Sequence, residues 1–454
     1  MDKSESFRDK VSTVDETGKR IWIFPKKSKG KYYSIRSYLS YLQLIFLFSA
    51  PFIEVNGKPL LLFDILNRHF VIFGITFWPQ DLHIFGVFLI FLIVFIILFT
   101  TVYGRIWCGW LCPQTIFMEM LFRKIEYFID GDSVSQKRLA TSEWNTNKTV
   151  KRITKHTLFF VLSFVMGNVF LAYFIGKEDL FKIITSSPKE HLSGFLMMLI
   201  FSITFYWIYA WFREQFCCFL CPYARLQSVL LDQNSVSVYY DYKRGEPRGK
   251  DSETTGDCID CNLCHAVCPT GIDIRDGSPQ LECIQCTACI DACDKVMSKR
   301  KKDKGLIRYA RQNEIEGKEQ SGIAIRSIIY LVLTVVLFFA VIFLLKNRTE
   351  VETTIIRNRG SVPIIENNLV LNVYNAKLLN KTRENKNIRF ELQEKGELTI
   401  PGGQRELGFE QTQAMTFFVR LPRESVVQGK NNITIDVYAD DKKIESIQTT
   451  FLGP

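Results

Sequence analysis

The sequence predicts a multi-domain membrane protein: an α-helical transmembrane bundle of about five spans, a cysteine-rich α+β insert and a C-terminal all-β sandwich. Three observations carry this prediction. Long uncharged apolar stretches alternate with basic connections, eight of the thirteen cysteines fall between residues 258 and 293, and short alternating strands fill the chain after residue 350. The 454 residues are 47% hydrophobic and include 37 phenylalanines, which excludes an ordinary soluble protein.

Five stretches lack charged side chains for long enough to cross a bilayer, or nearly so. They are Ser37–Ile53, Leu82–Gly104, Thr157–Gly176, Ser193–Phe212 and Ser327–Leu345. The first is at the lower length limit. Phe70–Gln80 is too short to cross, so we expect it to be interfacial or re-entrant. A buried core helix would explain any one stretch but not the whole set.

The net charge of +10 is distributed unevenly along the chain. Residues 1–36 carry ten Lys and Arg residues, 105–156 carry nine and 213–324 carry sixteen, whereas 54–81 and 177–192 carry two and three. This alternation is the positive-inside pattern. It predicts that the N-terminus and the cysteine-rich insert are cytoplasmic and that the C-terminal part lies on the other side. Because the membrane explains the charge, we expect no nucleic acid as a partner.

The insert contains two cysteine runs with the spacing C-x2-C-x2-C-x3-C, and Pro269 follows the first. This spacing is typical of bacterial two-cluster ferredoxins, in which the fourth cysteine of each run ligates the other cluster. We therefore predict a ferredoxin-like fold and two 4Fe–4S clusters. One would be held by Cys258, Cys261, Cys264 and Cys293, and the other by Cys283, Cys286, Cys289 and Cys268.

Zinc and disulfides are the competing explanations for these runs. Zinc sites usually combine two cysteine pairs across a longer spacer. Disulfides need an oxidising compartment, which the predicted topology argues against. Asp294 stands where the second run would carry proline, so the local geometry around Cys293 is expected to differ from that around Cys268.

A second cysteine pattern, C-x3-C-P, occurs after the second and fourth apolar stretches. It comprises Cys108, Cys112 and Pro113 in the first copy and Cys217, Cys221 and Pro222 in the second. Matched hairpins with the same motif at their ends predict a pseudo-twofold repeat around a shared site. Proline suits the first position of a helix, so we expect Cys112 beside a helix N-terminus, where the dipole favours thiolate.

A buried cysteine ordinarily serves only to fill the core. Two matched copies of the C-x3-C-P motif instead favour a redox or metal-binding role for these cysteines. Soft thiolates at low coordination number suit Cu(I), while a fully cysteinate iron site and a reversible disulfide remain alternatives. Cys218 is an additional thiol without an assigned role. His83 and His191 both lie at outer ends of spans, where haem ligation competes with an ordinary interfacial position.

The chain after Val351 has no cysteine and alternates like a β protein. Seven short strands separated by turn residues predict an immunoglobulin-like sandwich that binds partners and performs no catalysis. The predicted domains are therefore a basic arm (1–36), the bundle with its two repeats (37–230), the cluster domain with a basic connector (231–324), the last span (325–346) and the sandwich (347–454).

In this order, the two C-x3-C-P motifs, the two ferredoxin runs and the terminal sandwich resemble the cytochrome c oxidase accessory family known as CcoG, FixG or RdxA. The segments GKRIWIFPKK and RHFVIFGITFWPQD also resemble that family. The resemblance covers nearly the full length and implies a polyferredoxin of the bacterial inner membrane, with the sandwich in the periplasm.

The resemblance implies an enzyme that reduces Cu(II) to Cu(I) during assembly of a cbb3-type cytochrome c oxidase. Its copper-handling thiols would be Cys108, Cys112, Cys217 and Cys221. The implied partners are the membrane, copper ions and assembly factors or subunits of the oxidase, with a homodimer as one oligomeric option. The electron donor is not implied.

Two other functions compete with cupric reduction. One is an electron-transfer subunit of a quinol-oxidising respiratory chain, which would share the hairpins, the C-x3-C-P motifs and the ferredoxin runs. The other is a non-enzymatic copper carrier or assembly scaffold with structural or oxygen-sensing clusters. Stoichiometric Cu(II) reduction would exclude the scaffold, and reoxidation by quinone analogues would favour the respiratory subunit.

Overall fold

The chain divides into two compact units, Met1–Val341 and Ile342–Pro454. A computed structural model describes residues 12–55, 57–65, 69–250, 255–318, 324–358, 362–366, 368–382, 384–401, 405–409, 411–440 and 442–454. Residues 1–11 of the predicted basic arm and residues 319–323 of the predicted connector lie outside the described residues.

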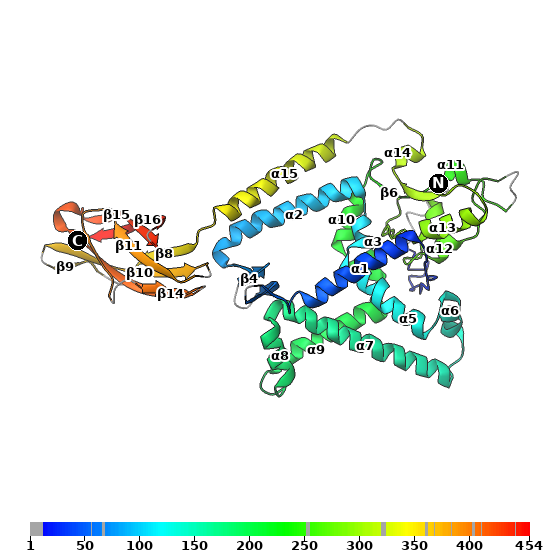
Figure 1. Cartoon of the computed structure of the whole chain (residues 1–454), viewed down its shortest axis with the longest axis horizontal. Helices are drawn as coiled ribbons and strands as arrows, with labels where there is room; N and C mark the ends of the chain where they lie inside the picture. Colours follow the sequence, from blue (N-terminus) through cyan, green and yellow to red (C-terminus); the bar gives the residue numbers. More distant parts are fainter. Residues whose placement is uncertain are drawn as a thin grey trace. The chain divides into compact units, whose positions relative to one another are not determined.

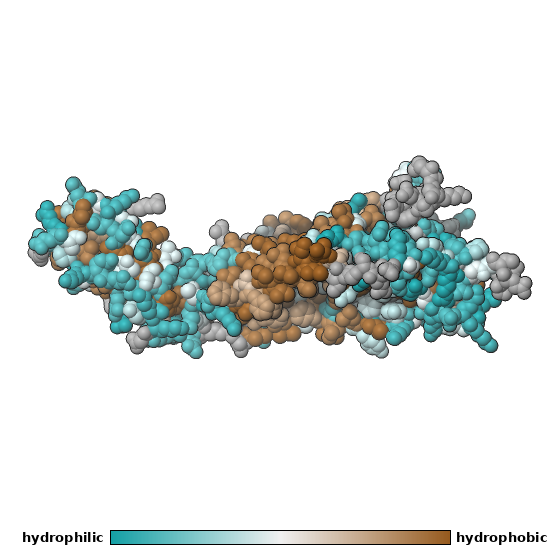
Figure 2. Space-filling model, turned by 90° about the horizontal axis from the view of Figure 1, so that it is seen from above, coloured by the Kyte–Doolittle hydropathy of each residue, from teal (hydrophilic) through white to brown (hydrophobic). Residues whose placement is uncertain are grey.

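Within the described residues, four helices are long and apolar enough to cross a membrane (Figure 1). They are α2 (Leu82–Tyr103), α7 (Thr146–Ile175), α9 (Leu192–Trp207) with its π-helical extension η3 (Ile208–Phe212), and α15 (Ile325–Lys346). A 22-residue helix such as α2 is about 33 Å long, which matches a hydrocarbon core of about 30 Å. In the first unit, hydrophobic residues form a broad surface over these helices and hydrophilic residues cover the cysteine-rich end (Figure 2).

Helix α1 (Lys31–Ser49) replaces the predicted first span Ser37–Ile53 and is not among the four long apolar helices. It begins earlier than predicted because another segment caps its first turn. The carboxylate of Asp291 accepts hydrogen bonds from the backbone N–H groups of Tyr32 (3.2 Å) and Tyr33 (2.8 Å). A side chain more than 250 positions away thus satisfies helix N–H groups that would otherwise lack a partner.

Short strands connect α1 to α2. They are β1 (Glu54–Val55), β2 (Lys58–Pro59), β3 (Leu61–Asp64), β4 (His69–Ile72) and β5 (Ile75–Phe77). Strands β3, β4 and β5 form an antiparallel sheet, and β3 packs against α7. The stretch Phe70–Gln80 is therefore largely extended and not a re-entrant helix.

The bundle continues through short helices, several of which adjoin the C-x3-C-P motifs. They are α3 (Ile106–Trp110), α4 (Pro113–Ile116), η2 (Phe117–Phe122), α5 (Arg123–Ile129), α6 (Ser133–Thr141), α8 (Lys177–Thr185), η4 (Phe216–Leu220) and α10 (Pro222–Leu230). Gly167 of α7 lies against the backbone of Ser202 in α9, so small residues permit close helix packing. The stacked rings of Phe122 and Tyr209 (centroids 4.5 Å apart) join the two repeats.

The cysteine-rich domain is a small α+β unit built on one strand pair. Its elements are β6 (Ser237–Tyr240), α11 (Tyr242–Gly245), α12 (Leu263–Ala266), η5 (Ile274–Asp276), α13 (Ala288–Lys299), β7 (Ile307–Ala310) and α14 (Gln312–Ile315). Strands β6 and β7 are antiparallel and bring segments on either side of the cysteine runs together. This agrees with the predicted α+β insert.

The C-terminal unit is an antiparallel β-sandwich. Its strands are β8 (Val351–Arg357), β9 (Ile364–Glu366), β10 (Leu369–Asn380), β11 (Lys386–Leu392), β12 (Glu397–Thr399), β13 (Arg405–Leu407), β14 (Thr412–Pro422), β15 (Gly429–Ala439) and β16 (Lys442–Gly453). One sheet has the order β12-β14-β10-β8, with β9 paired to β10, and the other has the order β13-β11-β15-β16. All seven predicted strands are present, and Tyr374, Phe390 and Phe417 stack between the sheets.

Candidate iron–sulfur and thiol site

The structure groups the cluster cysteines across the two runs. Burial raises the pKa of Cys293 to about 12, and the neighbouring Cys264, Cys258 and Cys261 add to this rise. The fourth cysteine of the second run therefore lies beside the first three of the other run. This is the arrangement that the ferredoxin spacing predicts.

The complementary set gathers in the same way. Burial raises the pKa of Cys283 to about 12 and that of Cys268 to about 11, with Cys286 a neighbour of both. Cys289 is likewise buried beside Cys286, Cys283 and Cys268. Raised pKa values favour the neutral thiols, so a bound metal cation has to displace their protons.

The backbone has the same unusual conformation in both runs. The residues on each side of the second cysteine have positive φ: Asp260 (51°) and Asn262 (54°) flank Cys261, whereas Gln285 (55°) and Thr287 (65°) flank Cys286. Non-glycine residues adopt this conformation rarely, and turns of this kind point successive N–H groups into an anion-binding hollow. The repeated geometry fits loops that wrap an anionic cluster.

The surroundings also fit iron–sulfur clusters. None of the thirteen cysteines forms a disulfide, and six of the eight cluster cysteines pack into a core with Val238, Ile272 and Ile274. In the described part of the chain, no three His, Cys, Asp or Glu side chains converge closely enough to hold one metal ion. Each cysteine of a cubane cluster ligates a different iron, so the sulfurs lie farther apart than the ligands of one ion. Ligation by these eight cysteines stays a prediction.

Helix α13 explains why Asp294 replaces proline. The last two cysteines of the second run lie in this twelve-residue helix, where proline at position 294 would remove a hydrogen bond and break the last turns. Asp294 instead accepts a hydrogen bond from the N–H of Gly305 (2.9 Å). The departure therefore extends the helix that carries Cys289 and Cys293.

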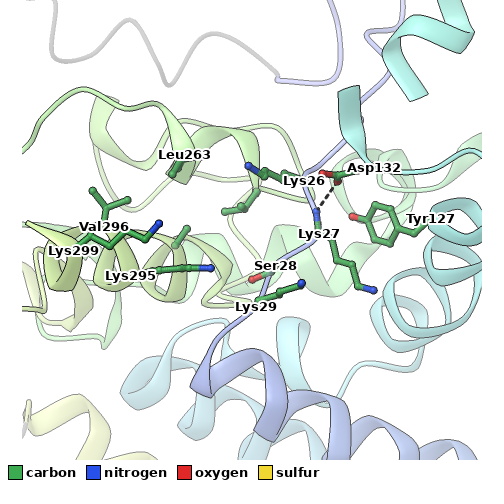
Figure 3. A pocket seen from close by; sticks show the side chains of 12 residues that line it. Lys26, Lys27, Ser28, Lys29, Tyr127, Asp132, Leu263, Lys295, Val296 and Lys299 are labelled. Carbon is green, nitrogen blue, oxygen red and sulfur yellow. Dashed lines mark hydrogen bonds between the residues drawn. The ribbon is translucent and has the colours of Figure 1, made fainter. Parts of the chain in front are cut away.

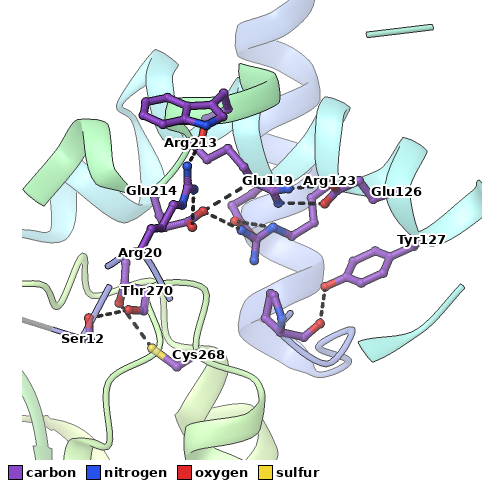
Figure 4. A network of polar contacts seen from close by, with 12 residues as sticks. Ser12, Arg20, Glu119, Arg123, Glu126, Tyr127, Arg213, Glu214, Cys268 and Thr270 are labelled. Atoms are coloured by element: carbon purple, nitrogen blue, oxygen red, sulfur yellow. Dashed lines mark hydrogen bonds and ion pairs between the residues drawn. The ribbon is translucent and has the colours of Figure 1, made fainter. Parts of the chain in front are cut away.

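Thr270 and Cys268 form a polar contact at the second cluster set (Figure 4). The Thr270 hydroxyl lies 3.4 Å from the Cys268 sulfur, and Ser12 donates to the Thr270 carbonyl (2.7 Å). When Cys268 binds iron as a thiolate, the hydroxyl must be the donor. Hydrogen bonds to cluster sulfurs are one of the determinants of reduction potential.

The two C-x3-C-P motifs have closely matched geometries. Cys112 is the N-cap of α4 and Cys221 the N-cap of α10, with Pro113 and Pro222 at the first helical positions. The partner thiols Cys108 and Cys217 lie in α3 and η4. The proline rule therefore predicted both helix starts.

The four thiols lie near one another and are largely buried. Burial raises the pKa of Cys108 to about 11, and Cys112 and Cys221 are among its charged neighbours. Burial likewise raises the pKa of Cys217 well above its usual value, and the neighbouring Cys112 and Cys108 raise that pKa further. The structure thus brings the two repeats together around one group of thiols.

The structure corrects the expectation that the helix N-terminus makes Cys112 a thiolate. Burial raises its pKa, although backbone N–H groups of Thr115 and Gln114 at the helix N-terminus act in the opposite direction. Desolvation of the charged sulfur outweighs the helix end. Burial therefore opposes the thiolate that the helix N-terminus favours at Cys112.

Gln227 connects the two repeats at this site. The Cys108 thiol donates to the Gln227 side-chain oxygen (2.9 Å), and the Gln227 amide donates to the Thr100 hydroxyl (3.2 Å). Gln227 is fully buried on α10 of the second repeat. Sequence reasoning missed it, because glutamine in a helix carries no distinctive spacing.

The thiol group packs directly against the second cluster loop. Gly109 lies between the cysteines of the first motif, and a Cβ there would stand 2.4 Å from the Ile284 carbonyl oxygen and 2.9 Å from the Cys286 nitrogen. Cys108 shares a hydrophobic core with Cys286. Arg36 donates to the Cys286 carbonyl (3.0 Å), which holds the loop from the other side.

A buried ionic network borders the thiol site on α5 and the η3–η4 connection (Figure 4). Arg213 donates to both carboxylate oxygens of Glu126 (2.6 and 2.7 Å). Burial alone would raise the pKa of Glu126, but Arg213, Lys155 and Arg123 lower it to about 2. Figure 4 also shows Glu214 between Arg20 and Arg123. The network joins the N-terminal arm to both repeats.

The histidines named as haem candidates have local contacts. The Nδ1 atom of His83 lies 3.1 Å from the Gln80 carbonyl oxygen, within one helical turn. His191 is the N-cap of α9. These contacts suit interfacial histidines.

Family models match three parts of the chain. Residues 85–130 match a 4Fe-4S binding domain, residues 212–312 a 4Fe-4S dicluster domain and residues 341–454 the IG-like fold at the C-terminal of FixG. The first match includes Cys108 and Cys112, and the second includes both ferredoxin runs.

Curated relatives extend over most of the chain. The protein RdxA of Cereibacter sphaeroides is 33% identical over 82% of this chain and 82% of its own length, and RdxB of that organism is 33% identical over 84% of each. The nitrogen fixation protein FixG of Rhizobium meliloti is 36% identical over 64% of this chain, a match that spans 57% of FixG. A crystal structure of a FixG-related protein from Vibrio parahaemolyticus aligns with 23% of this chain at 14% identity and a TM-score of 0.21.

Proposed function

This chain belongs to the FixG family, with RdxA and RdxB, and on that premise we propose that it reduces Cu(II) to Cu(I) for the assembly of a cbb3-type oxidase. Family membership and the 4Fe–4S domain matches make it a membrane iron–sulfur protein of the electron-transfer type. The copper substrate and the oxidase are the proposed part.

The contact between Gly109 and the loop of Cys286 is the observation that carries the proposal. It seats the first C-x3-C-P motif against residues that would hold a cluster. When bound, the clusters would supply one-electron transfer. Reduction of Cu(II) to Cu(I) consumes one electron, so electron source and substrate match in stoichiometry.

The thiols favour the reduced ion. Two thiolates of a C-x3-C-P pair bind Cu(I) more strongly than Cu(II), because soft sulfur prefers the soft ion. Each thiol loses its proton on binding, so a bound cation has to displace the protons that desolvation favours on Cys108 and Cys217. Binding and reduction therefore act in the same direction.

Gln227 and the ionic network act as positioning groups. The Gln227 side-chain oxygen accepts a hydrogen bond from the Cys108 thiol and so orients the Cys108 side chain toward the second repeat. The Arg213–Glu126 pair fixes the chain immediately before Cys217. In this proposal the thiols and clusters are cytoplasmic and the sandwich is periplasmic, as the distribution of basic residues favours.

Replacement of Cys112 and Cys221 together by serine tests the assignment. We expect Cu(II) reduction by the dithionite-reduced protein, measured with a Cu(I)-specific chelator, to be abolished. The iron–sulfur absorbance should be unchanged. Cys218→Ser is the matched control, because this buried thiol adjoins the site without belonging to either pair. Copper reduction that survives in the double variant contradicts the assignment.

Iron at the same thiols is the second candidate, because the 4Fe-4S binding-domain match over residues 85–130 includes Cys108 and Cys112. Four cysteines from two repeats form a complete cysteinate ligand set. Iron and copper analysis of anaerobically purified protein separates the two. An iron content above two clusters that falls in the Cys112/Cys221 double variant would assign the thiols to iron.

A further inference from the structure

Five lysines surround a cavity of about 510 Å³ beside the first cluster set (Figure 3). They are Lys26, Lys27, Lys29, Lys295 and Lys299, and they define the lysine pocket. Three of them precede α1 and two lie one helical turn apart on α13. Segments distant in sequence thus contribute to one positive surface.

The charge of the lysine pocket is not neutralised internally. All five lysines are exposed, and within the described residues none of their ammonium groups pairs with a carboxylate. Asp132 is the one acidic residue of the lining, and it accepts a hydrogen bond from the backbone N–H of Lys27 (3.3 Å). An anionic ligand would therefore meet ammonium groups that no carboxylate of the described residues neutralises.

The wall of the lysine pocket is built from residues next to cluster cysteines. Leu263 precedes Cys264, and Val296 packs into the core that contains Cys264 and Cys293. Lys295 and Lys299 lie on α13, the helix that carries Cys293. A molecule seated in the lysine pocket would therefore lie beside the predicted cluster of Cys258, Cys261, Cys264 and Cys293.

We propose that the lysine pocket docks the electron donor, and that this donor is a small acidic protein that carries one electron at a time. The proposal rests on the proposed function in requiring that the clusters receive electrons. Each Cu(II) reduced takes one electron, so one carrier molecule is oxidised by one electron per copper ion. A nicotinamide donor transfers a hydride, which carries two electrons and a proton, and would need a flavin to divide the pair.

Charge complementarity supports a protein carrier. Unpaired lysines around a hollow attract an acidic patch over long range and raise the association rate, an effect that salt weakens. A lipid headgroup could also neutralise lysines near the membrane. A headgroup site has no need of residues that adjoin cluster ligands, whereas a donor site does.

Binding of a reduced acidic flavodoxin to the full-length protein in neutral-lipid nanodiscs tests the proposal. The variant Lys29→Glu/Lys295→Glu/Lys299→Glu reverses three charges of the lysine pocket. The matched control Lys137→Glu/Lys250→Glu/Lys304→Glu reverses three exposed lysines outside it. Iron content and the electron paramagnetic resonance spectrum show whether each variant retains its clusters.

We expect the wild-type protein to bind the flavodoxin with an affinity that falls as salt rises. The pocket variant should bind at least about tenfold more weakly, and the control within about twofold of wild type. Equal weakening in both variants, or none in either, overturns the proposal. Unchanged flavodoxin binding together with lost thermal stabilisation by anionic lipid would identify a headgroup site and also overturn it. Copper reduction by wild-type protein that has been reduced with dithionite and freed of excess dithionite needs no docked carrier, so failure of that assay counts against the proposed function alone.

Discussion

Individual side chains around the cysteines set the properties of the site. Thr270 is buried, and its hydroxyl is positioned to donate to the Cys268 sulfur. Such a bond stabilises the more negative, reduced cluster. The effect belongs to one atom and leaves the fold intact, so it can be tested by a nearly isosteric change.

Thr270→Val should lower the reduction potential of the cluster that includes Cys268 by about 40 mV, since a hydrogen bond contributes about 1 kcal/mol to this one-electron couple. Redox titration followed by electron paramagnetic resonance measures the shift. Ser12→Ala is the control, because Ser12 bonds the Thr270 carbonyl and not the sulfur. Equal potentials in Thr270→Val and wild type would show that the hydroxyl does not reach the thiolate.

Gln227 offers a second test at this scale. Gln227→Leu removes the acceptor of the Cys108 thiol and the donor to Thr100 while keeping side-chain volume. We expect slower copper reduction with unchanged iron content, because Cys108 loses its fixed orientation. Gln227→Glu keeps an acceptor oxygen and should restore part of the rate. A rate equal to wild type in Gln227→Leu would remove Gln227 from the positioning groups.

At the scale of elements, the contact between α3 and the cluster loop is the main feature. Gly109 permits it, because any Cβ there would overlap the Ile284 carbonyl. Backbone atoms on both sides leave little room for adjustment. Glycine here is required by close approach and not by a turn.

Gly109→Ala should separate the first C-x3-C-P motif from the cluster loop, lower stability by about 1–3 kcal/mol and slow copper reduction. Thermal unfolding in detergent and a single-turnover copper assay measure the two effects. Gly86→Ala in α2 is the matched control, since a Cβ at Gly86 meets no atom within 4 Å. Wild-type rates in Gly109→Ala would disprove the importance of this contact.

The buried network makes a separate prediction. Glu126→Gln removes the carboxylate that accepts two hydrogen bonds from buried Arg213 and leaves that guanidinium its longer ion pair with Glu214 (3.5 Å). Removing one member of a buried pair costs about 3–5 kcal/mol. Asp179→Asn breaks the exposed pair with Lys182 and should cost less than about 1 kcal/mol. Similar melting temperatures for the two variants would mean that another carboxylate, such as that of Glu214, compensates for the loss of Glu126.

At the scale of the whole molecule, the two units differ in what they contribute. The first contains the helices, the thiols and the cluster domain, whereas the second has its own hydrophobic core, including Tyr374 and Phe417. A fragment of residues 347–454 should therefore fold alone and unfold cooperatively, as circular dichroism during heating would show. A fragment without a cooperative transition would mean that the sandwich depends on the first unit.

The spacing of cysteines and prolines along the sequence predicted most features that depend on a single segment. The cysteine runs predicted the crossed grouping of Cys293 with Cys258, and the prolines predicted the starts of α4 and α10. The start of α1 was not predictable, because Asp291 caps it from a segment far along the chain. The rise in the pKa of Cys112 was not predictable, because burial depends on neighbours that the local sequence does not show.

By itself the sequence determined the membrane helices, the cluster motifs, the sandwich and the family, because these depend on periodicity and short spacings within one segment. Tertiary structure alone decided which segments meet. It placed Gly109 against the Cys286 loop, joined Gln227 to Cys108 and gathered the lysine pocket from two distant segments. Packing between remote segments depends on the complementary shape and charge of both, and a single segment's pattern carries neither.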